Sequence, residues 1–400
     1  MVQLTRELVR IPSRGGLDPY EPVLDRMASW LGDRGMACAR LTGPEGTSVA
    51  LVCEVKGAHP GPRYVLDACL DTAPFGDESS WTYPPTSAEI SGGWMHGRGT
   101  SDSKSGAAIF AHVAARLYAS VPQLHGTVVL LFDVDEHTGR FGGAKAFFEG
   151  PDGRIRTDGV MIGYPGLGHV VTGGRGILRA DLRVYGVASH SGGSKVTPSA
   201  VAKAAALVSG LHAVRLPGPC GPEFPLAPRL TVTAINGGQG YSTVPDLCEI
   251  SVDVRLTPAL GDHAALDLVR SVAMAVDSAW PGTRPTAVEV TGHWPAFALP
   301  EGSALRAALL DAAAAAGLTV RPKIAGPSSI GNYLAGLGIP ATAGFGVDYA
   351  DLHGTDERIR IDSIPLVHAV YHQALLNLLD GSGPGLVHAA PGAAAANRQQ

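Results

Sequence analysis

Cysteine is scarce in this sequence: the 400 residues include five cysteines, at positions 38, 53, 69, 220 and 248. The number is odd and there is no Cys-x-x-Cys pair, so a disulfide framework is excluded and reduced thiols in a cytoplasmic protein are predicted. The chain also lacks any run of 18 uncharged apolar residues, which excludes a membrane-spanning helix. The first residues, MVQLTRELVRIPS, carry charge throughout and predict an amphipathic helix, not a signal peptide.

Clustered positive charge is missing as well. Lysine and arginine total 31 against 36 acidic residues, for a net charge of −5. Nucleic-acid grooves need concentrated positive charge, so we expect no nucleic-acid partner, and no membrane partner either. The composition that remains, 45% hydrophobic and 17% charged, is typical of a soluble globular protein.

The length exceeds what one compact core usually holds, so two domains are expected. Strand-like apolar runs at 47–55, 64–70 and 127–134 alternate with helical patterns, among them the alanine-rich segment 104–120. This alternation predicts an α/β fold with a mostly parallel sheet. Further helices are predicted at 2–11, 21–34, 303–316 and 363–379.

The pattern changes near residue 173. Residues 177–190 alternate apolar and polar side chains, as a half-exposed antiparallel strand does. Helix, two strands, helix and strand follow, which is the β–α–β–β–α–β order of a ferredoxin-like α+β domain. We therefore predict a domain at 173–290 inserted into a catalytic domain made of 1–172 and 291–385. The low-complexity residues 386–400 predict a disordered tail.

Polar residues cluster where the predicted strands end. The loops are CLDTAP (69–74), GRGTSDSKSG (97–106) and DEHTG (135–139). Each has an ordinary structural explanation, since Asp102 is a suitable helix N-cap and an Asp-Glu pair is common in solvated turns. Ligands of open α/β sheets bind beyond the carboxyl ends of the strands, so the three loops together predict a catalytic cleft. A late histidine, His353 in DLHGTDE, supports the same prediction.

These motifs resemble those of the two-domain zinc amidohydrolases, a family that includes aminoacylase, carboxypeptidase G, acetylornithine deacetylase and succinyl-diaminopimelate desuccinylase. The resemblance extends from about residue 3 to 380, and GRGTSDSKSG matches its family motif at every fixed position. CLD, DEHTG, GYP (163–165), GVASH (186–190) and LHGTDE match the other motifs in order. The resemblance implies hydrolysis of an amide bond in an N-acyl amino acid or small peptide, and a homodimer formed through the inserted domain, which would act as a lid.

The resemblance also implies the metal ligands, with departures. Asp102 matches a carboxylate that bridges two zinc ions, and His137 and His353 match the other ligands of one ion. Cys69 and Tyr164 stand where the second ion has a histidine and an acid. Two imidazoles and a carboxylate suit one zinc ion, or manganese, cobalt or iron. A neutral tyrosine is a poor ligand, so one ion is expected in preference to two.

Other roles are implied in the same way. Glu136 matches the catalytic carboxylate that acts as general base. Asp71 matches an acid that orients the first-motif ligand; beside Cys69 it is expected to hold a backbone turn or a different ligand. His190 matches a histidine that steadies the oxyanion in a partner subunit's active site, and a surface histidine is the alternative.

Substrate contacts are implied at two places. Arg255 matches a position that binds the substrate carboxylate in some relatives, with a structural ion pair as the alternative. The segment 326–332 matches a substrate-pocket loop, in which Ser328, Ser329 and Asn332 are expected to form hydrogen bonds to the substrate.

Two alternatives to metal-dependent hydrolysis stay open. In the first, the protein is metal-free and Cys69 is a nucleophile for acyl transfer, activated by His137 or His353. The carboxylates of Asp102 and Glu136 count against it, because they would raise the pKa of a neighbouring thiol. In the second, the chain is a non-catalytic relative that binds a ligand. The acyl group and the reaction direction, hydrolysis or a biosynthetic condensation or cyclisation, also stay open.

Overall fold

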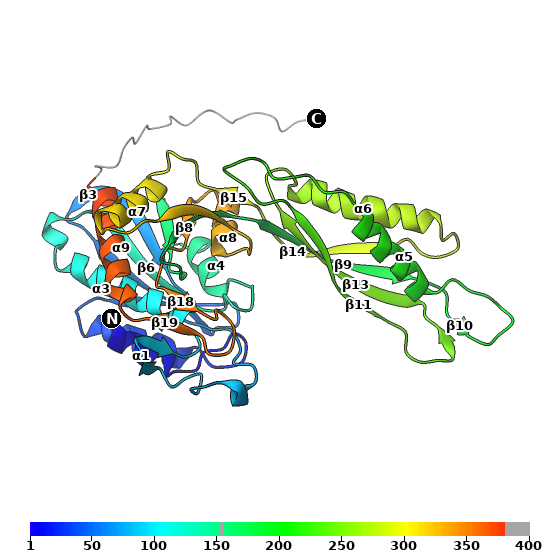
Figure 1. The fold of residues 1–400 in the computed structure, drawn as a ribbon, viewed down its shortest axis with the longest axis horizontal. Helices are drawn as coiled ribbons and strands as arrows, with labels where there is room; N and C mark the ends of the chain where they lie inside the picture. Colours follow the sequence, from blue (N-terminus) through cyan, green and yellow to red (C-terminus); the bar gives the residue numbers. More distant parts are fainter. Residues whose placement is uncertain (152–154, 381–400) are drawn as a thin grey trace.

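The computed structural model describes residues 1–151 and 155–380, so the predicted tail at 386–400 lies outside the described residues. Two bodies lie one after the other along the long axis of the molecule (Figure 1). The larger contains both ends of the described chain, and the smaller is formed by the middle of the sequence. No helix in the described part of the chain is long and apolar enough to cross a membrane.

A six-stranded sheet forms the centre of the larger body. Its strands, in spatial order, are β1 (Cys38–Thr42), β2 (Ser48–Lys56), β6 (His125–Asp133), β3 (His59–Asp67), β7 (Gly159–Ile162) and β17 (Ala341–Ala343). Neighbours from β6 to β17 are parallel, whereas β2 is antiparallel to both of its neighbours, β1 and β6. The α/β class predicted from the sequence is confirmed, with parallel pairing limited to one side of the sheet.

Helices cover both faces of this sheet. One face packs on α1 (Val2–Val9), α2 (Glu21–Gly32), α3 (Ser105–Tyr118), α7 (Ala304–Ala315) and α9 (Ser363–Leu379), and the other on α4 (Gly142–Phe148) and α8 (Ile330–Gly336). The two-residue period of β2 shows why both faces are apolar: Leu51, Cys53 and Val55 join the first core, and Ala50 and Val52 join the second.

The smaller body has its own core, which is formed within residues 178–288. Its elements along the chain are β9 (Gly176–Tyr185), α5 (Ala200–Ala213), β11 (Arg229–Gly237), β13 (Leu247–Leu256), α6 (Asp262–Ser278) and β14 (Ala287–Trp294). The antiparallel sheet has the order β11-β13-β9-β14, and both helices cover one of its faces. A short ribbon of β10 (Ser189–His190) and β12 (Thr243–Val244) lies at the end remote from the larger body (Figure 1).

Two small sheets complete the larger body. One consists of β15 (Phe297–Ala298), β8 (His169–Gly174) and β16 (Arg321–Ala325); the other of β18 (Tyr349–Ala350), β19 (Arg358–Arg360), β5 (Trp94–His96) and β4 (Glu89–Ser91). Short helical turns span Glu78–Ser80, Thr100–Lys104 and Val121–Gln123. Because β5 pairs with β19, the loop that follows β5 lies beside the loop that precedes β19. This pairing brings GRGTSDSKSG and DLHGTDE together.

Candidate active site

Parallel pairing places the ends of β3 and β6 at the same edge of the central sheet. The amide of Leu70 donates to the carbonyl of Asp133, so the chain after β3 runs alongside the chain after β6. Cys69 and Asp71 from the first segment thereby approach Glu136 and His137 from the second. The loops CLDTAP and DEHTG therefore meet, as the sequence predicted.

Asp71 is buried and fixes the loop that carries Glu136 and His137. Its carboxylate accepts hydrogen bonds from the backbone amides of Glu136 (3.3 Å) and His137 (2.9 Å). Of the two roles expected for Asp71, this is the backbone turn. The loop is also bounded by left-handed residues, Asp135 at φ 72° and Phe141 at φ 57°. Non-glycine residues in this conformation cluster where surrounding structure imposes a functional geometry.

Asp102, His137 and His353 form a group whose ligand atoms all lie within 4.8 Å of one another. His353 Nε2 lies 3.0 Å from Asp102 Oδ2, and His137 Nε2 lies 3.6 Å from the same oxygen. The side chain of His137 is only 4% exposed, yet neither ring nitrogen forms a hydrogen bond within the described chain. A buried imidazole without hydrogen bonds is costly, and the carboxylates of Asp71 and Glu136, each 3.5 Å from Nδ1, lie near it without bonding. This donor set and its unpaired nitrogens fit a divalent cation of the zinc type.

The charges of this group favour a cation. Burial alone would raise the pKa of Asp102, but the imidazoles of His137 and His353 hold it below its usual value, so the carboxylate is ionised. Burial would likewise lower the pKa of His137, and the carboxylates of Asp102 and Asp71 raise it instead. The site thus presents fixed negative charge around the imidazole.

A buried ion pair that the sequence did not reveal joins the two ligand loops. Arg98 Nη1 lies 2.6 Å from Glu357 Oε2, and both side chains are almost fully buried. Glu357 also accepts hydrogen bonds from the amide and hydroxyl of Ser101, while Arg98 donates to the carbonyl of His353. The pair therefore fixes Asp102 relative to His353. The sequence held one sign of this pair: Arg98 lies in GRGTSDSKSG and Glu357 lies in DLHGTDE.

Glu136 lies beside the ligand group and is held by Tyr164. The Tyr164 hydroxyl donates to Glu136 Oε1 at 2.8 Å. Burial, with the nearby carboxylate of Asp102, raises the pKa of Glu136 to about 7. The position that the resemblance assigned to a metal ligand, Tyr164, thus contacts the predicted base instead.

Cys69 lines the site. Its side chain is buried, and Sγ lies 3.9 Å from Asp102 Oδ1 and 3.6 Å from Ser103 Oγ. With Asp71 and His137 it forms a second group of ligand atoms within 4.8 Å. Burial raises the pKa of the Cys69 thiol well above its usual value. A free thiolate is therefore disfavoured at this position.

The predicted pocket loop has a structural role at Asn332. This side chain is fully buried; its amide donates to the carbonyls of Gly174, Arg175 and Pro295, and its oxygen accepts from the amide of Ser329. The substrate contact predicted for Asn332 is thus wrong, because internal bonds occupy its polar atoms. The hydroxyls of Ser328 and Ser329 bond to the backbone of Arg175 and Gly331.

Arg255 lies at the base of the smaller body, in a cavity of about 410 Å³ with two further arginines, Arg175 and Arg229. Its Nε pairs with Asp253 at 2.7 Å. The backbone of Gly326 forms part of the wall, so the cavity reaches the predicted pocket loop. Three guanidinium groups against one carboxylate favour an anionic ligand.

His190 is not brought to the site within one chain. It lies on β10, at the end of the smaller body remote from the larger one (Figure 1). Its ring nitrogen Nδ1 accepts a hydrogen bond from the amide of Gly192.

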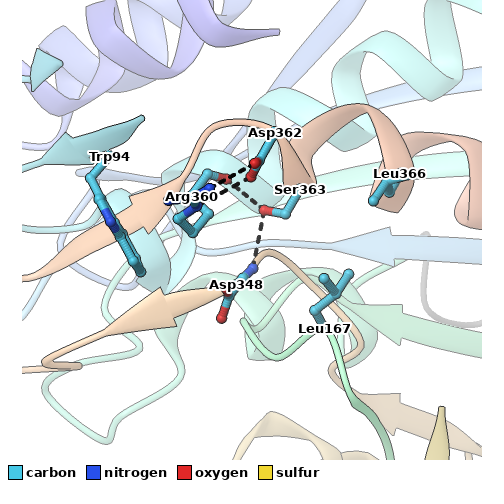
Figure 2. Close-up of a pocket in the computed structure, with 7 residues that line it drawn as sticks. All are labelled: Trp94, Leu167, Asp348, Arg360, Asp362, Ser363 and Leu366. Carbon is cyan, nitrogen blue, oxygen red and sulfur yellow. Dashed lines mark hydrogen bonds and ion pairs between the residues drawn. The ribbon is translucent and has the colours of Figure 1, made fainter. Parts of the chain in front are cut away.

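A separate cavity at the start of α9 contains none of the predicted site residues. It measures about 510 Å³ and is shown in Figure 2, with Trp94 and Leu366 as apolar walls. Its polar groups bond to one another: Arg360 pairs with Asp362 at 2.9 Å, and the Ser363 hydroxyl donates to the Arg360 carbonyl. This cavity therefore carries no evident chemistry.

This chain is similar to proteins of known family. A protein-family model described as peptidase family M20/M25/M40 matches residues 65–377. The succinyl-diaminopimelate desuccinylase of Psychrobacter arcticus is 27% identical over 320 residues, which is 77% of this chain and 76% of that protein.

Solved structures share the fold. An M20 family metallo-carboxypeptidase from Sulfolobus solfataricus superposes with a TM-score of 0.75 at 17% identity, over 94% of this chain and 98% of that one. The YXEP protein of Bacillus subtilis, described as a dinuclear metal binding peptidase, superposes with a TM-score of 0.69 at 16% identity, over 95% and 97% of the two chains.

Proposed function

The chain belongs to peptidase family M20/M25/M40 and is an amide-bond hydrolase; from this premise we propose that it hydrolyses an N-acyl amino acid or small peptide with one bound divalent cation. The observation that carries the proposal is the carboxylate of Glu136, largely buried with 15% of its side chain exposed, beside the group of Asp102, His137 and His353. Zinc is the ion that this donor set favours, and manganese, cobalt or iron would also suit it.

Each residue of the site has its own role in the proposed reaction. Asp102, His137 and His353 would hold the cation, which supplies a Lewis acid that polarises the substrate carbonyl. Glu136 takes a proton from the attacking water and passes it to the leaving nitrogen. Tyr164 holds Glu136 Oε1, which leaves Oε2 for the proton. Asp71 keeps the loop of Glu136 and His137 in register through two backbone amides.

The cavity of Arg175, Arg229 and Arg255 supports a substrate with a free carboxylate. An N-acyl amino acid or peptide carries such a group beside its amide bond, and bidentate guanidinium contacts would fix its orientation. Ser328 and Ser329 lie on the adjoining loop and remain part of the proposed pocket.

A second copy of the chain would complete the site if His190 steadies the oxyanion, because His190 is remote from the cleft of its own chain. We therefore propose a homodimer formed through the smaller body. A cytoplasmic location is supported by the five cysteines, which are all free.

Metal content and activity measured on one preparation test the main proposal. The protein is purified without chelator, analysed for metals and assayed against N-acetyl, N-succinyl and dipeptide substrates. We expect close to one zinc, manganese, cobalt or iron per chain, and hydrolysis that a chelator abolishes and metal restores. A chain that binds no metal on titration would overturn the mechanism.

A second candidate function rests on the group of Cys69, His137 and Asp71, which has the order of a thiol, an imidazole and a carboxylate. In it Cys69 would be acylated and the acyl group passed to water or an amine. The raised pKa of the buried thiol counts against this route. Cys69→Ser distinguishes the two, since it abolishes acyl transfer by this route but leaves the cation group of Asp102 largely intact.

A further inference from the structure

Two of the five cysteines face each other on neighbouring strands, away from the cleft. Cys38 on β1 is the direct register partner of Cys53 on β2 in an antiparallel pair. Cys53 belongs to the core under α1, α2 and α3, and Cys38 packs against that same core. The two side chains therefore leave the sheet on the same face.

The spacing of such a pair suits a covalent bond. Directly opposed residues of antiparallel strands have Cα atoms about 4.5–5.5 Å apart, within the range of about 4.4–6.8 Å found in disulfides. Their Cβ atoms, about 4.5–5.5 Å apart, need to approach by roughly 1 Å at most. The edge strand β1 can make this movement, since β2 is its sole partner among the described strands of that sheet.

The two thiols differ in access and in acidity. Cys38 is partly exposed, whereas Cys53 is 1% exposed. The neighbouring thiol of Cys53, helped by Arg40, lowers the pKa of Cys38 despite its partial burial. The same contact and burial raise the pKa of Cys53. Cys38 is thus suited to react first with a solute, and Cys53 to react afterwards with Cys38.

We propose that Cys38 and Cys53 form a reversible disulfide that responds to peroxides. The Cys38 sulfur attacks one peroxide oxygen and becomes a sulfenic acid, the O–O bond breaks, and the other oxygen leaves as water with the thiol proton. The Cys53 sulfur then attacks Cys38, the S–O bond breaks, and the hydroxyl leaves as a second water with the Cys53 proton. Both thiols are oxidised, the peroxide is reduced, and a dithiol reductant restores the pair.

The disulfide would link the edge strand β1 covalently to β2. The hairpin that joins these strands lies beside the loop that carries Glu136. Residues Thr42, Glu45 and Thr47 of this hairpin line a cavity of about 730 Å³ together with Asp135, which precedes Glu136. Closing the loop 38–53 restricts the unfolded chain and raises the melting temperature. Neither thiol lies in the catalytic group, so the modification is separate from amide hydrolysis.

Peptide mass spectrometry on the full chain tests the proposal. The reduced protein is treated with stepwise additions of hydrogen peroxide, free thiols are blocked, and linked peptides are identified. We expect a Cys38–Cys53 link that dithiothreitol removes, and a melting temperature that rises with the link and falls on reduction. Cys248, buried on β13 opposite Val184 and Gly237, serves as the internal control and stays free.

Single substitutions complete the test. Cys53→Ser should leave Cys38 as a sulfenic acid that a dimedone probe captures, while Cys38→Ser should leave Cys53 unreacted at the same peroxide concentration. Cys220→Ser, which removes an exposed thiol, should leave the link unchanged. The proposal is overturned if Cys38 and Cys53 stay free while Cys220 is fully oxidised, or if Cys38 is oxidised in the unaltered chain without linking to Cys53.

Discussion

Two buried basic side chains, one in each body, have opposite surroundings. Lys203 in the smaller body is fully buried, and its Nζ donates to the carboxylate of Asp277 (2.7 Å), the hydroxyl of Thr283 (2.9 Å) and the carbonyl of Arg284 (3.1 Å). These are three acceptors for three N–H groups. His137 in the larger body is almost as buried, but both its ring nitrogens lack a hydrogen bond within the described chain.

The difference distinguishes a buried side chain that stabilises the fold from one that is available to bind a ligand. A buried polar group with all its partners stabilises the fold, whereas one without partners costs stability unless something else binds it. Three carboxylates, those of Asp71, Asp102 and Glu136, lie within 3.6 Å of the His137 ring, and a cation is the partner that we propose for this group. The polar groups around Lys203 need nothing further.

The largest effect is expected at the catalytic carboxylate. Glu136→Gln keeps the shape of the side chain and removes its basicity, so kcat should fall by on the order of 10²–10⁴-fold. Metal content should stay the same, because Glu136 is outside the group of Asp102, His137 and His353. Steady-state kinetics with elemental analysis measure both quantities. Full activity in the variant would remove Glu136 from the mechanism.

The unpaired imidazole can be tested through binding-linked stability. After a chelator has removed all metal from the wild-type protein, zinc added at 100 times its Kd should raise the free energy of unfolding by about 2.7 kcal/mol. His137→Gln should lose this gain, because the imidazole that we propose as a zinc ligand is gone. Chemical unfolding with and without zinc measures the difference. An equal zinc effect in both proteins would show that His137 is not a ligand.

The paired lysine should behave in the opposite way. Lys203→Met leaves the carboxylate of Asp277 without its cation, and the free energy of unfolding should fall by about 2 kcal/mol. This loss of unfolding free energy is smaller than for a fully buried ion pair, because Asp277 keeps some contact with water. Metal content and kcat should be unchanged. A large loss of kcat without a loss of stability would contradict the comparison.

The smallest effect is expected at the arginine cavity. The side chain of Arg229 forms no ion pair or hydrogen bond in the described part of the chain, whereas Arg183 on the same sheet lies near Glu249 and Glu289. Arg229→Ala should raise KM about 10-fold for substrates with a free carboxylate, with kcat nearly unchanged. Arg183→Ala is the matched control and should not alter KM. Equal effects on an esterified substrate would exclude carboxylate binding by Arg229.

The sequence predicted the local parts of this structure better than its long-range contacts. The helix at 363–379 follows from its periodic pattern, and the structure has it. The meeting of CLDTAP and DEHTG follows from parallel pairing. The ion pair of Arg98 and Glu357 depends instead on two loops brought together by a small sheet, which no local pattern encodes.

The same limit explains the error at Asn332. Its polar side chain in a loop motif suggested a substrate contact. The position of a polar residue in the sequence does not reveal whether nearby backbone groups will occupy its hydrogen-bonding atoms. At Tyr164 the motif correctly predicted a residue that lines the site, but not what this residue contacts. Its hydroxyl donates to the predicted base, Glu136.

The position of His353 late in the sequence orders the assembly of this site during synthesis on the ribosome. Asp102 and His353 are 251 positions apart, and the smaller body, contiguous from β9 to β14, emerges between them. That body can fold while the larger one still lacks β17 and the loop of His353. In a nascent chain the group of Asp102, His137 and His353 can therefore assemble only after residue 353 has emerged. Chains that end before His353 would lack one of the three residues of this group.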